Sequence, residues 1–193
     1  MRLWKLVVPV CLLGLAMHAH AQQSASTDEV TDQATKDEMC KHTICQHNLR
    51  VTLKRKDGST FDKTYDVLPG AVQPFGLLIV TGQTLYIEAD ATNDGLANLR
   101  VVEAVTHPEK TLTATLKQTA DGNMQLKLTN PFKRALKFNM GMMPLDRPRL
   151  LKTSSCPVIA GGFSFESWGE PIFQVALTKA RFIDLNGDND TCD

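Results

Sequence analysis

The amino-acid sequence predicts an all-β protein, an antiparallel β-sandwich of immunoglobulin-like character with about eight or nine short strands. Apolar residues alternate with polar ones in one short segment after another, which is the period of a strand with one buried face. Turn residues separate these segments, and no helical spacing of apolar residues interrupts them. A small closed β-barrel is the alternative architecture that the same pattern allows.

The first 21 residues have the pattern of a cleaved export signal. Arg2 and Lys5 precede a short apolar run over residues 6–16, and the sequence Ala-His-Ala follows at positions 19–21. A transmembrane helix needs about 18 consecutive apolar residues, which this run does not reach. The sequence therefore predicts a periplasmic or secreted protein without a membrane span.

The charge of the exported chain argues against nucleic acid as a partner. The whole sequence carries 21 Lys and Arg against 21 Asp and Glu, and cleavage of the signal removes two of the positive charges. The remaining chain is slightly acidic, whereas proteins that bind nucleic acid usually carry a basic surplus.

The part that folds is expected to begin after a polar leader. Residues 22–38 contain one large apolar side chain, Val30, and cannot bury enough surface to offset the entropy cost of ordering. We therefore expect a flexible leader over residues 22–38 and a single domain over residues 39–193.

Four cysteines remain after the signal is removed: Cys40, Cys45, Cys156 and Cys192. An even number of cysteines in an exported protein is typical of disulfides. Four cysteines allow three connectivities, and the sequence alone does not choose among them. We favour a local Cys40–Cys45 loop and a Cys156–Cys192 link that ties down the C-terminus. The two alternatives would join one end of the domain to the other.

Three Asp-Gly turns set the predicted registers of three hairpins. The turns contain Gly58, Gly95 and Gly122. A three-residue loop with glycine in the left-handed conformation places apolar residues opposite apolar ones in all three hairpins, and Glu88 opposite Arg100. The predicted pairs are Leu53–Phe61, Leu49–Tyr65, Ala89–Leu99, Ile87–Val101, Glu88–Arg100, Leu116–Leu126 and Ala114–Leu128.

The remaining segments complete the predicted strand order. A tight turn at residues 107–110 would set Val105 against Leu112, so that residues 84–130 form a four-stranded antiparallel meander. Further strands are expected at about 135–140 and 172–182. Residues 141–170 are richer in Gly, Pro and Ser, and we expect loops there with one short strand near 163–167.

A methionine cluster suggests a copper site, although the predicted fold requires no cofactor. Met140, Met142 and Met143 offer the thioether sulfurs that Cu(I) prefers. Further ligands could come from His42, His47 or Met124. The alternative is that these methionines fill gaps in the core.

A second candidate metal site lies near the C-terminus. Asp184, Asn186, Asp188 and Asp190 are spaced like the first ligands of a calcium-binding loop. The chain ends before the bidentate carboxylate that usually completes such a loop. The alternative is a solvated acidic tail held by Cys192.

The sequence contains no catalytic motif that we recognise. The Gly-x-Ser-x-Gly, Ser-x-x-Lys and His-Glu-x-x-His patterns are all missing. Glu166 and Glu170 form a carboxylate pair of the kind that glycosidases use, but a structural turn is the favoured interpretation. We therefore expect a non-enzymatic protein.

The segment 141–170 carries the side chains that are typical of binding hot spots. They are Phe163, Phe165, Trp168, Arg147 and Arg149. Loops at the end of a rigid sandwich commonly make such contacts. We therefore predict a module that binds an envelope or secreted protein in an inhibitor, immunity or accessory role, with metal binding as the alternative function.

Overall fold

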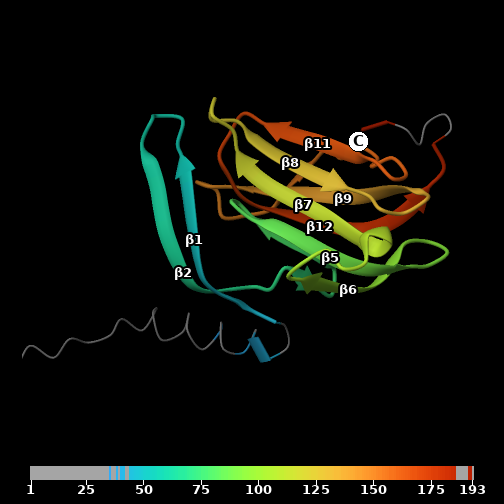
Figure 1. The fold of residues 1–193 in the computed structure, drawn as a ribbon. Helices are drawn as coiled ribbons and strands as arrows, with labels where there is room; N and C mark the ends of the chain where they lie inside the picture. Colours follow the sequence, from blue (N-terminus) through green and yellow to red (C-terminus); the bar gives the residue numbers. More distant parts are fainter. Residues whose placement is uncertain (1–34, 36–37, 39, 42–43, 186–190, 193) are drawn as a thin grey trace, which may run out of the picture.

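The structure is a computed structural model that describes residues 35, 38, 40–41, 44–185 and 191–192. Two five-stranded antiparallel sheets lie face to face, and a two-stranded hairpin crosses one end of them (Figure 1). The described strands form open sheets and no closed barrel. The predicted antiparallel β-sandwich is therefore confirmed, and the barrel is not the architecture.

The twelve strands exceed the eight or nine expected, because β3, β4 and β10 have no alternating pattern that would mark them in the sequence. From edge to edge, sheet I contains β10 (Leu151–Thr153), β9 (Ala135–Pro144), β12 (Ile172–Ile183), β4 (Gly76–Val80) and β3 (Val72–Gln73). Sheet II contains β11 (Phe163–Trp168), β8 (Met124–Thr129), β7 (Thr111–Gln118), β5 (Thr84–Ala91) and β6 (Leu96–Val102). The end hairpin consists of β1 (Gln46–Lys54) and β2 (Thr60–Leu68).

Most strands bury alternate residues between the sheets, as the period of two predicts. On β7, for example, Leu112, Ala114 and Leu116 belong to the core. Strand β4 differs, because all residues from Leu77 to Val80 are buried. It lies inside sheet I, and a strand covered on both faces reads as a continuous apolar run rather than an alternating one.

Two of the three hairpin loops have the predicted form. Gly58 and Gly122 have φ values of 84° and 86°, which is the left-handed region where glycine carries no steric penalty. The loop residues are flanked by backbone bonds from Arg55 N to Ser59 O and from Thr119 N to Asn123 O, each 2.8 Å long. The predicted registers follow, with the pairs Leu53–Phe61, Leu49–Tyr65, Leu116–Leu126 and Ala114–Leu128.

The prediction of a three-residue loop at Gly95 is wrong. Thr92 N donates to Gly95 O at 2.8 Å, which leaves a two-residue turn. The register then shifts by one residue at a bulge between Glu88 and Asp90. Beyond the bulge, Ile87–Val101 and Glu88–Arg100 pair as predicted. The predicted pair Ala89–Leu99 falls at the bulge itself and does not form. A Cβ on Gly95 would lie 2.2 Å from Ala180 O, so glycine serves close packing here rather than a left-handed turn.

The predicted meander over residues 84–130 is also wrong. Strand β5 lies between β6 and β7, so Ile87 rather than Val105 pairs with Leu112. Residues 103–110, which include the short 3₁₀ helix η1 (Pro108–Lys110), cross over the outer face of sheet II. The buried carboxylate of Glu88 on that face holds the crossover in place.

The β1–β2 hairpin closes one end of the sandwich (Figure 1). Its residues Val51 and Leu53 are buried in the core. Gln118 at the end of β7 holds the hairpin, since its side-chain amide accepts a hydrogen bond from Lys54 N at 2.8 Å and donates one to Lys54 O at 2.9 Å. The amide thus takes the place of a peptide group of a neighbouring strand.

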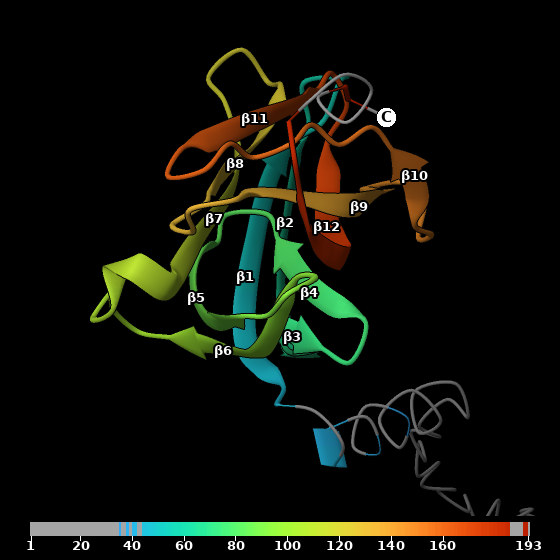
Figure 2. The same ribbon diagram turned by 90° about the vertical axis from the view of Figure 1, so that its right-hand side faces the viewer.

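The sandwich also has two open sides, where the edge strands of the two sheets face each other. On one side the edges are β10 and β11, and residues 154–162 run between them (Figure 2). Val158 in this segment is buried and forms a two-way backbone bridge with Leu136 of β9. We call this the closed side.

On the opposite side the edges are β3 and β6. Strand β3 has two residues against seven in β6, so it covers only part of the facing edge. Residues 44–46, which lead into β1, lie beside them and leave a cavity. We call this the hollow side.

Candidate functional site

Both favoured disulfides are present in the structure. Cys40 is bonded to Cys45 and Cys156 to Cys192, with Cα–Cα distances of 5.5 and 4.1 Å. The first closes a loop beside the hollow side, and the second ties the C-terminal end to the segment that fills the closed side.

The most exposed aromatic side chains of the predicted partner surface lie on β11. Phe163 is 55% exposed and Phe165 is 47% exposed, and their ring centroids are 5.2 Å apart in an edge-to-face arrangement. Lys127 of the neighbouring β8 places its Nζ 5.2 Å from the first ring centroid and 5.9 Å from the second. We call these three residues the β11 surface.

The backbone of β11 is free along one edge. Its only partner among the described strands is β8, and Asn130 N donates to Gly162 O at 2.8 Å just before β11 begins. Because the backbone direction alternates along an antiparallel strand, the N–H and C=O groups of Phe163, Phe165 and Ser167 then face away from β8. The exposed aromatic pair therefore stands on an unpaired sheet edge.

Trp168 lies on the other face of the same strand. Successive side chains of a strand point to opposite faces, so the even-numbered residues of β11 turn inward. Trp168 packs against the core, and its indole Nε1 donates to Thr153 Oγ1 at 2.9 Å. The structure therefore separates Trp168 from Phe163 and Phe165.

The two arginines predicted for the partner surface belong to the β9–β10 connection. Arg147 Nη2 donates to Glu170 Oε2 at 2.6 Å, whereas the side chain of Arg149 is exposed. This connection joins strands of sheet I, and the β11 surface belongs to sheet II. The arginines are therefore not part of the β11 surface.

The candidate carboxylate pair does not converge on one site. Glu166 is turned inward and buried, and its Oε1 accepts a hydrogen bond from Cys156 N at 2.6 Å. Burial raises the pKa of Glu166, while the Cys156 bond and the charge of Lys137 act in the opposite direction. Glu170 instead pairs with Arg147 near the surface. Glu166 therefore links β11 to the segment 154–162, and Glu170 holds the β9–β10 connection through Arg147.

The methionine cluster is divided between the two faces of β9. Met140 is 4% exposed and belongs to the core, and Met142 packs against the same core. Met143, one residue further along the strand, lies opposite Gln174 of β12. His47 is exposed on β1, and His42 lies outside the described residues. Copper binding stays a prediction, which native mass spectrometry after dialysis against Cu(I) would test.

The candidate calcium loop is only partly within the described residues. Asp184 is exposed, and Asn186, Asp188 and Asp190 lie outside them. Among the described residues, no group of three or more His, Cys, Asp or Glu side chains is placed to hold a metal ion. Calcium binding also stays a prediction, and the same mass spectrum would test it with millimolar Ca²⁺.

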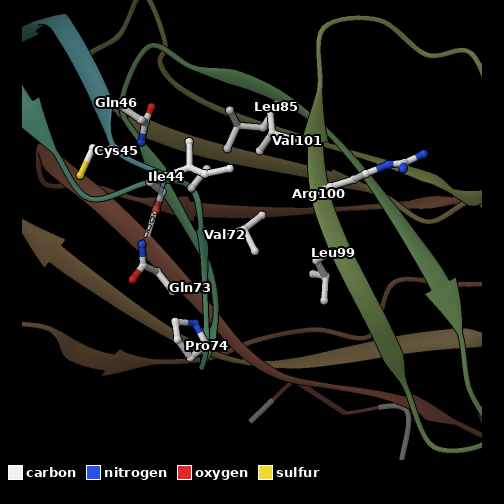
Figure 3. A pocket seen from close by; sticks show the side chains of 12 residues that line it. Ile44, Cys45, Gln46, Val72, Gln73, Pro74, Leu85, Leu99, Arg100 and Val101 are labelled. Carbon is white, nitrogen blue, oxygen red and sulfur yellow. Dashed lines mark hydrogen bonds between the residues drawn. The ribbon is translucent and has the colours of Figure 1, made fainter. Parts of the chain in front are cut away.

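The hollow side contains a cavity of about 530 Å³ (Figure 3). Its walls are mainly aliphatic, and they come from three separate parts of the chain. They are residues 44–46, the β3 region from Gly70 to Pro74, and the facing strands β5 and β6. The sequence did not reveal this cavity, because each contribution looks like ordinary strand or turn sequence until the three segments meet.

The predicted Glu88–Arg100 pair belongs to a larger charged network on the outer face of sheet II, and its other members, His107 and Lys110, were not predicted from the sequence. The Glu88 carboxylate accepts hydrogen bonds from Nε and Nη2 of Arg100, and His107 Nδ1 lies 2.8 Å from Glu88 Oε1. Lys110 Nζ lies 3.8 Å from the same carboxylate. The hydrogen bonds from His107 and Arg100 lower the pKa of Glu88 to about 2. This network fixes the crossover to the sheet.

Comparisons with known proteins do not assign the chain to a family. No family model, no curated protein and no solved structure matches it. Within the described residues, no helix is long and apolar enough to cross a membrane.

Proposed function

We propose that this chain is an exported, non-enzymatic binding module that recognises an envelope or secreted protein through the β11 surface. The observation that carries the proposal is the adjacent pair of exposed phenylalanines, Phe163 and Phe165, on an edge of β11 that no other strand within the described residues pairs with. Two disulfides in the fold are compatible with export.

An exposed apolar edge strand carries a risk that proteins usually avoid. Unpaired backbone groups beside apolar side chains favour uncontrolled pairing with other chains, and edges are commonly protected by charges, prolines or bulges. Strand β11 has no proline, and its outward side chains are Phe163, Phe165 and Ser167. A partner that adds to this edge would satisfy the backbone groups and cover the rings at the same time.

The surroundings of β11 make this edge rigid. Its inward side chains Glu166 and Trp168 are tied by hydrogen bonds to residues 153–156, and the Cys156–Cys192 disulfide holds that segment. A preorganised edge loses little conformational entropy on binding. Lys127 beside the rings adds a cation that can pair with an acidic group on the partner.

Site-specific photo-crosslinking in the producing cell tests the proposal. A photoreactive residue in place of Ser167 should crosslink to one other exported protein, because Ser167 lies on the free edge. The double variant Phe163→Ser/Phe165→Ser should reduce that crosslink about tenfold or more, since each lost aromatic anchor removes a hot-spot contact.

The matched control is Phe75→Ser, because Phe75 is 52% exposed and does not belong to the β11 surface. It should leave the crosslink unchanged, and both variants should unfold at the temperature of the parent protein. Equal crosslinking by the double variant and the parent would contradict the proposed site. Absence of any crosslink to another protein would contradict the proposed function.

A further inference from the structure

The cavity on the hollow side is lined mainly by apolar side chains that converge from different elements. Six of them are shown in Figure 3: Ile44, Val72, Pro74, Leu85, Leu99 and Val101. Leu85 is a buried core residue, so the cavity reaches down to the core between the sheets. Ligand-binding pockets commonly have volumes of about 300–1,000 Å³ and mostly apolar walls, and a volume of about 530 Å³ lies within this range.

The wall beside β3 is built to keep its shape. A Cβ on Gly70 would lie 1.6 Å from Ile44 O, so only glycine allows the two segments to approach so closely. Gln73 Nε2 donates to Gly70 O at 2.7 Å, and Gln46 Nε2 donates to Pro69 O at 3.0 Å. The side-chain amides of Gln73 and Gln46 are thus hydrogen-bonded to backbone carbonyl groups, and the aliphatic groups of this wall face the cavity.

One charged side chain borders the cavity. Among the described residues that line it, Arg100 is the only one with an ionised side chain, and none carries a carboxylate. The Arg100 side chain is 63% exposed and points away from the apolar side chains (Figure 3). Its Nε and Nη2 are bonded to Glu88, but Lys110 also approaches that carboxylate, so Glu88 is shared between two cations. A negative group beside the mouth would therefore meet positive charge.

We propose that the hollow side binds a single-chain amphiphile with an anionic head group. The apolar chain occupies the cavity between β3 and β6, and the head group lies outside it beside Arg100. Aliphatic walls suit an alkyl or acyl chain, which has no hydrogen bonds to satisfy, and the exposed guanidinium supplies the charge that complements the head. This site is separate from the β11 surface, so it stands independently of the proposed protein partner.

Fluorescence titration with cis-parinaric acid tests this site directly, because the fluorescence of this fatty acid increases in an apolar environment. The full exported chain should show saturable binding of one molecule. Leu99→Trp places a larger side chain in the cavity and should weaken binding about tenfold or more, because it removes the space for the chain. Val101→Trp is the second blocking variant, for the case that Leu99→Trp does not fold.

Leu150→Trp is the matched control, since Leu150 is 46% exposed on the β9–β10 connection and does not line the cavity. It should bind the probe like the parent protein. Unsaturable binding by the parent, or equal binding by the folded blocking variants, would overturn the proposal.

The head group is tested with ligands rather than variants, because replacing Arg100 would also disturb Glu88. The neutral methyl ester of cis-parinaric acid should bind about three- to fivefold more weakly than the acid, as expected for the loss of an exposed ion pair. Equal affinities of acid and ester would overturn the anionic assignment.

Displacement of the probe then separates the two sources of such a molecule. Lauric acid represents free fatty acids, and a lauroyl lysophosphatidylglycerol represents membrane lipids with one chain. Displacement by either supports the site, and the tighter competitor identifies the source. Failure of both to displace the probe would show that the probe binds elsewhere and would overturn the proposal.

Discussion

The closed side and the hollow side are built from the same components, a pair of edge strands and a disulfide-bonded chain segment. On the closed side, residues 154–162 bring the buried Val158 between the sheets, and Glu166 of β11 accepts a hydrogen bond from Cys156 N of this segment. On the hollow side, residues 44–46 bring no buried apolar side chain, and Ile44 is almost fully exposed.

The two sides differ because only the segment on the closed side is long enough to reach the core. A nine-residue segment can run beside β9 and still turn into β11, whereas the residues that lead into β1 only pass the edge of the cavity. The closed side therefore contributes stability and positions the β11 surface. The hollow side keeps a cavity.

The two disulfides should show the largest difference between the sides. Replacing Cys156 and Cys192 with serine opens a link of 36 residues and should lower the free energy of unfolding by about 4 kcal/mol in the chain-entropy model. The same change at Cys40 and Cys45 opens a link of five residues and should cost about 2 kcal/mol. Urea unfolding of the two double variants measures both values, and a larger loss at Cys40 and Cys45 would reverse the comparison.

The two faces of β11 should respond differently to truncation. Trp168→Ala removes a ring that packs on the core together with its bond to Thr153, and should destabilise the protein by about 2–3 kcal/mol. Phe163→Ala removes an exposed ring and should change stability by less than about 0.5 kcal/mol. Thermal unfolding of both variants tests which face of β11 is buried. A larger loss of stability in Phe163→Ala than in Trp168→Ala would contradict the inward position of Trp168.

The same substitution on each side gives a matched pair. Val158→Ala removes two methyl groups from a fully buried site on the closed side and should cost about 2 kcal/mol. Val72→Ala on the hollow side removes methyl groups that already border a cavity, and should cost about 0.5 kcal/mol. Similar losses in urea unfolding would show that the hollow side is packed as tightly as the closed one.

Two glutamates should give opposite pH effects of smaller size. The pKa of Glu88 is lowered to about 2, so its contribution is complete above the ordinary value of 4.5 and is lost as pH falls towards 2. Burial on the closed side raises the pKa of Glu166, so its contribution is complete below 4.5 and is lost as pH rises through the raised value.

Unfolding midpoints between pH 2 and pH 7 separate the two groups. Glu88→Gln should flatten the acidic limb of the stability profile, and Glu166→Gln should flatten the decline above pH 4.5 while keeping the acceptor for Cys156 N. An unchanged profile in either variant would contradict the cause assigned to that limb.

Several features of the fold follow from local sequence because local forces decide them. The Asp-Gly loops at Gly58 and Gly122 need the left-handed conformation, and that requirement alone sets the register of two hairpins. At Gly95 the glycine is required for a different reason, because a Cβ there would collide with the backbone of Ala180. The sequence does not indicate that Ala180 lies beside Gly95.

The candidate sites show the same limit. The aromatic residues of β11 could be identified as a group, but only the strand's alternation sends Phe163 and Phe165 outward and Trp168 inward. The Glu88–Arg100 pair follows from the hairpin register, but no spacing in the sequence indicates that His107 meets the same carboxylate.

The sequence left three disulfide pairings open, but it was sufficient for the all-β class, the strands with one buried face and two hairpin registers. These features depend on the side-chain period and on turn conformation, which act over a few residues. Only the tertiary structure decided which side of the sandwich is filled and which is hollow. That outcome depends on how segments far apart in the chain bury apolar surface between the two sheets. The segments are residues 44–46, the β3 region and β6 on the hollow side, and residues 154–162 on the closed side.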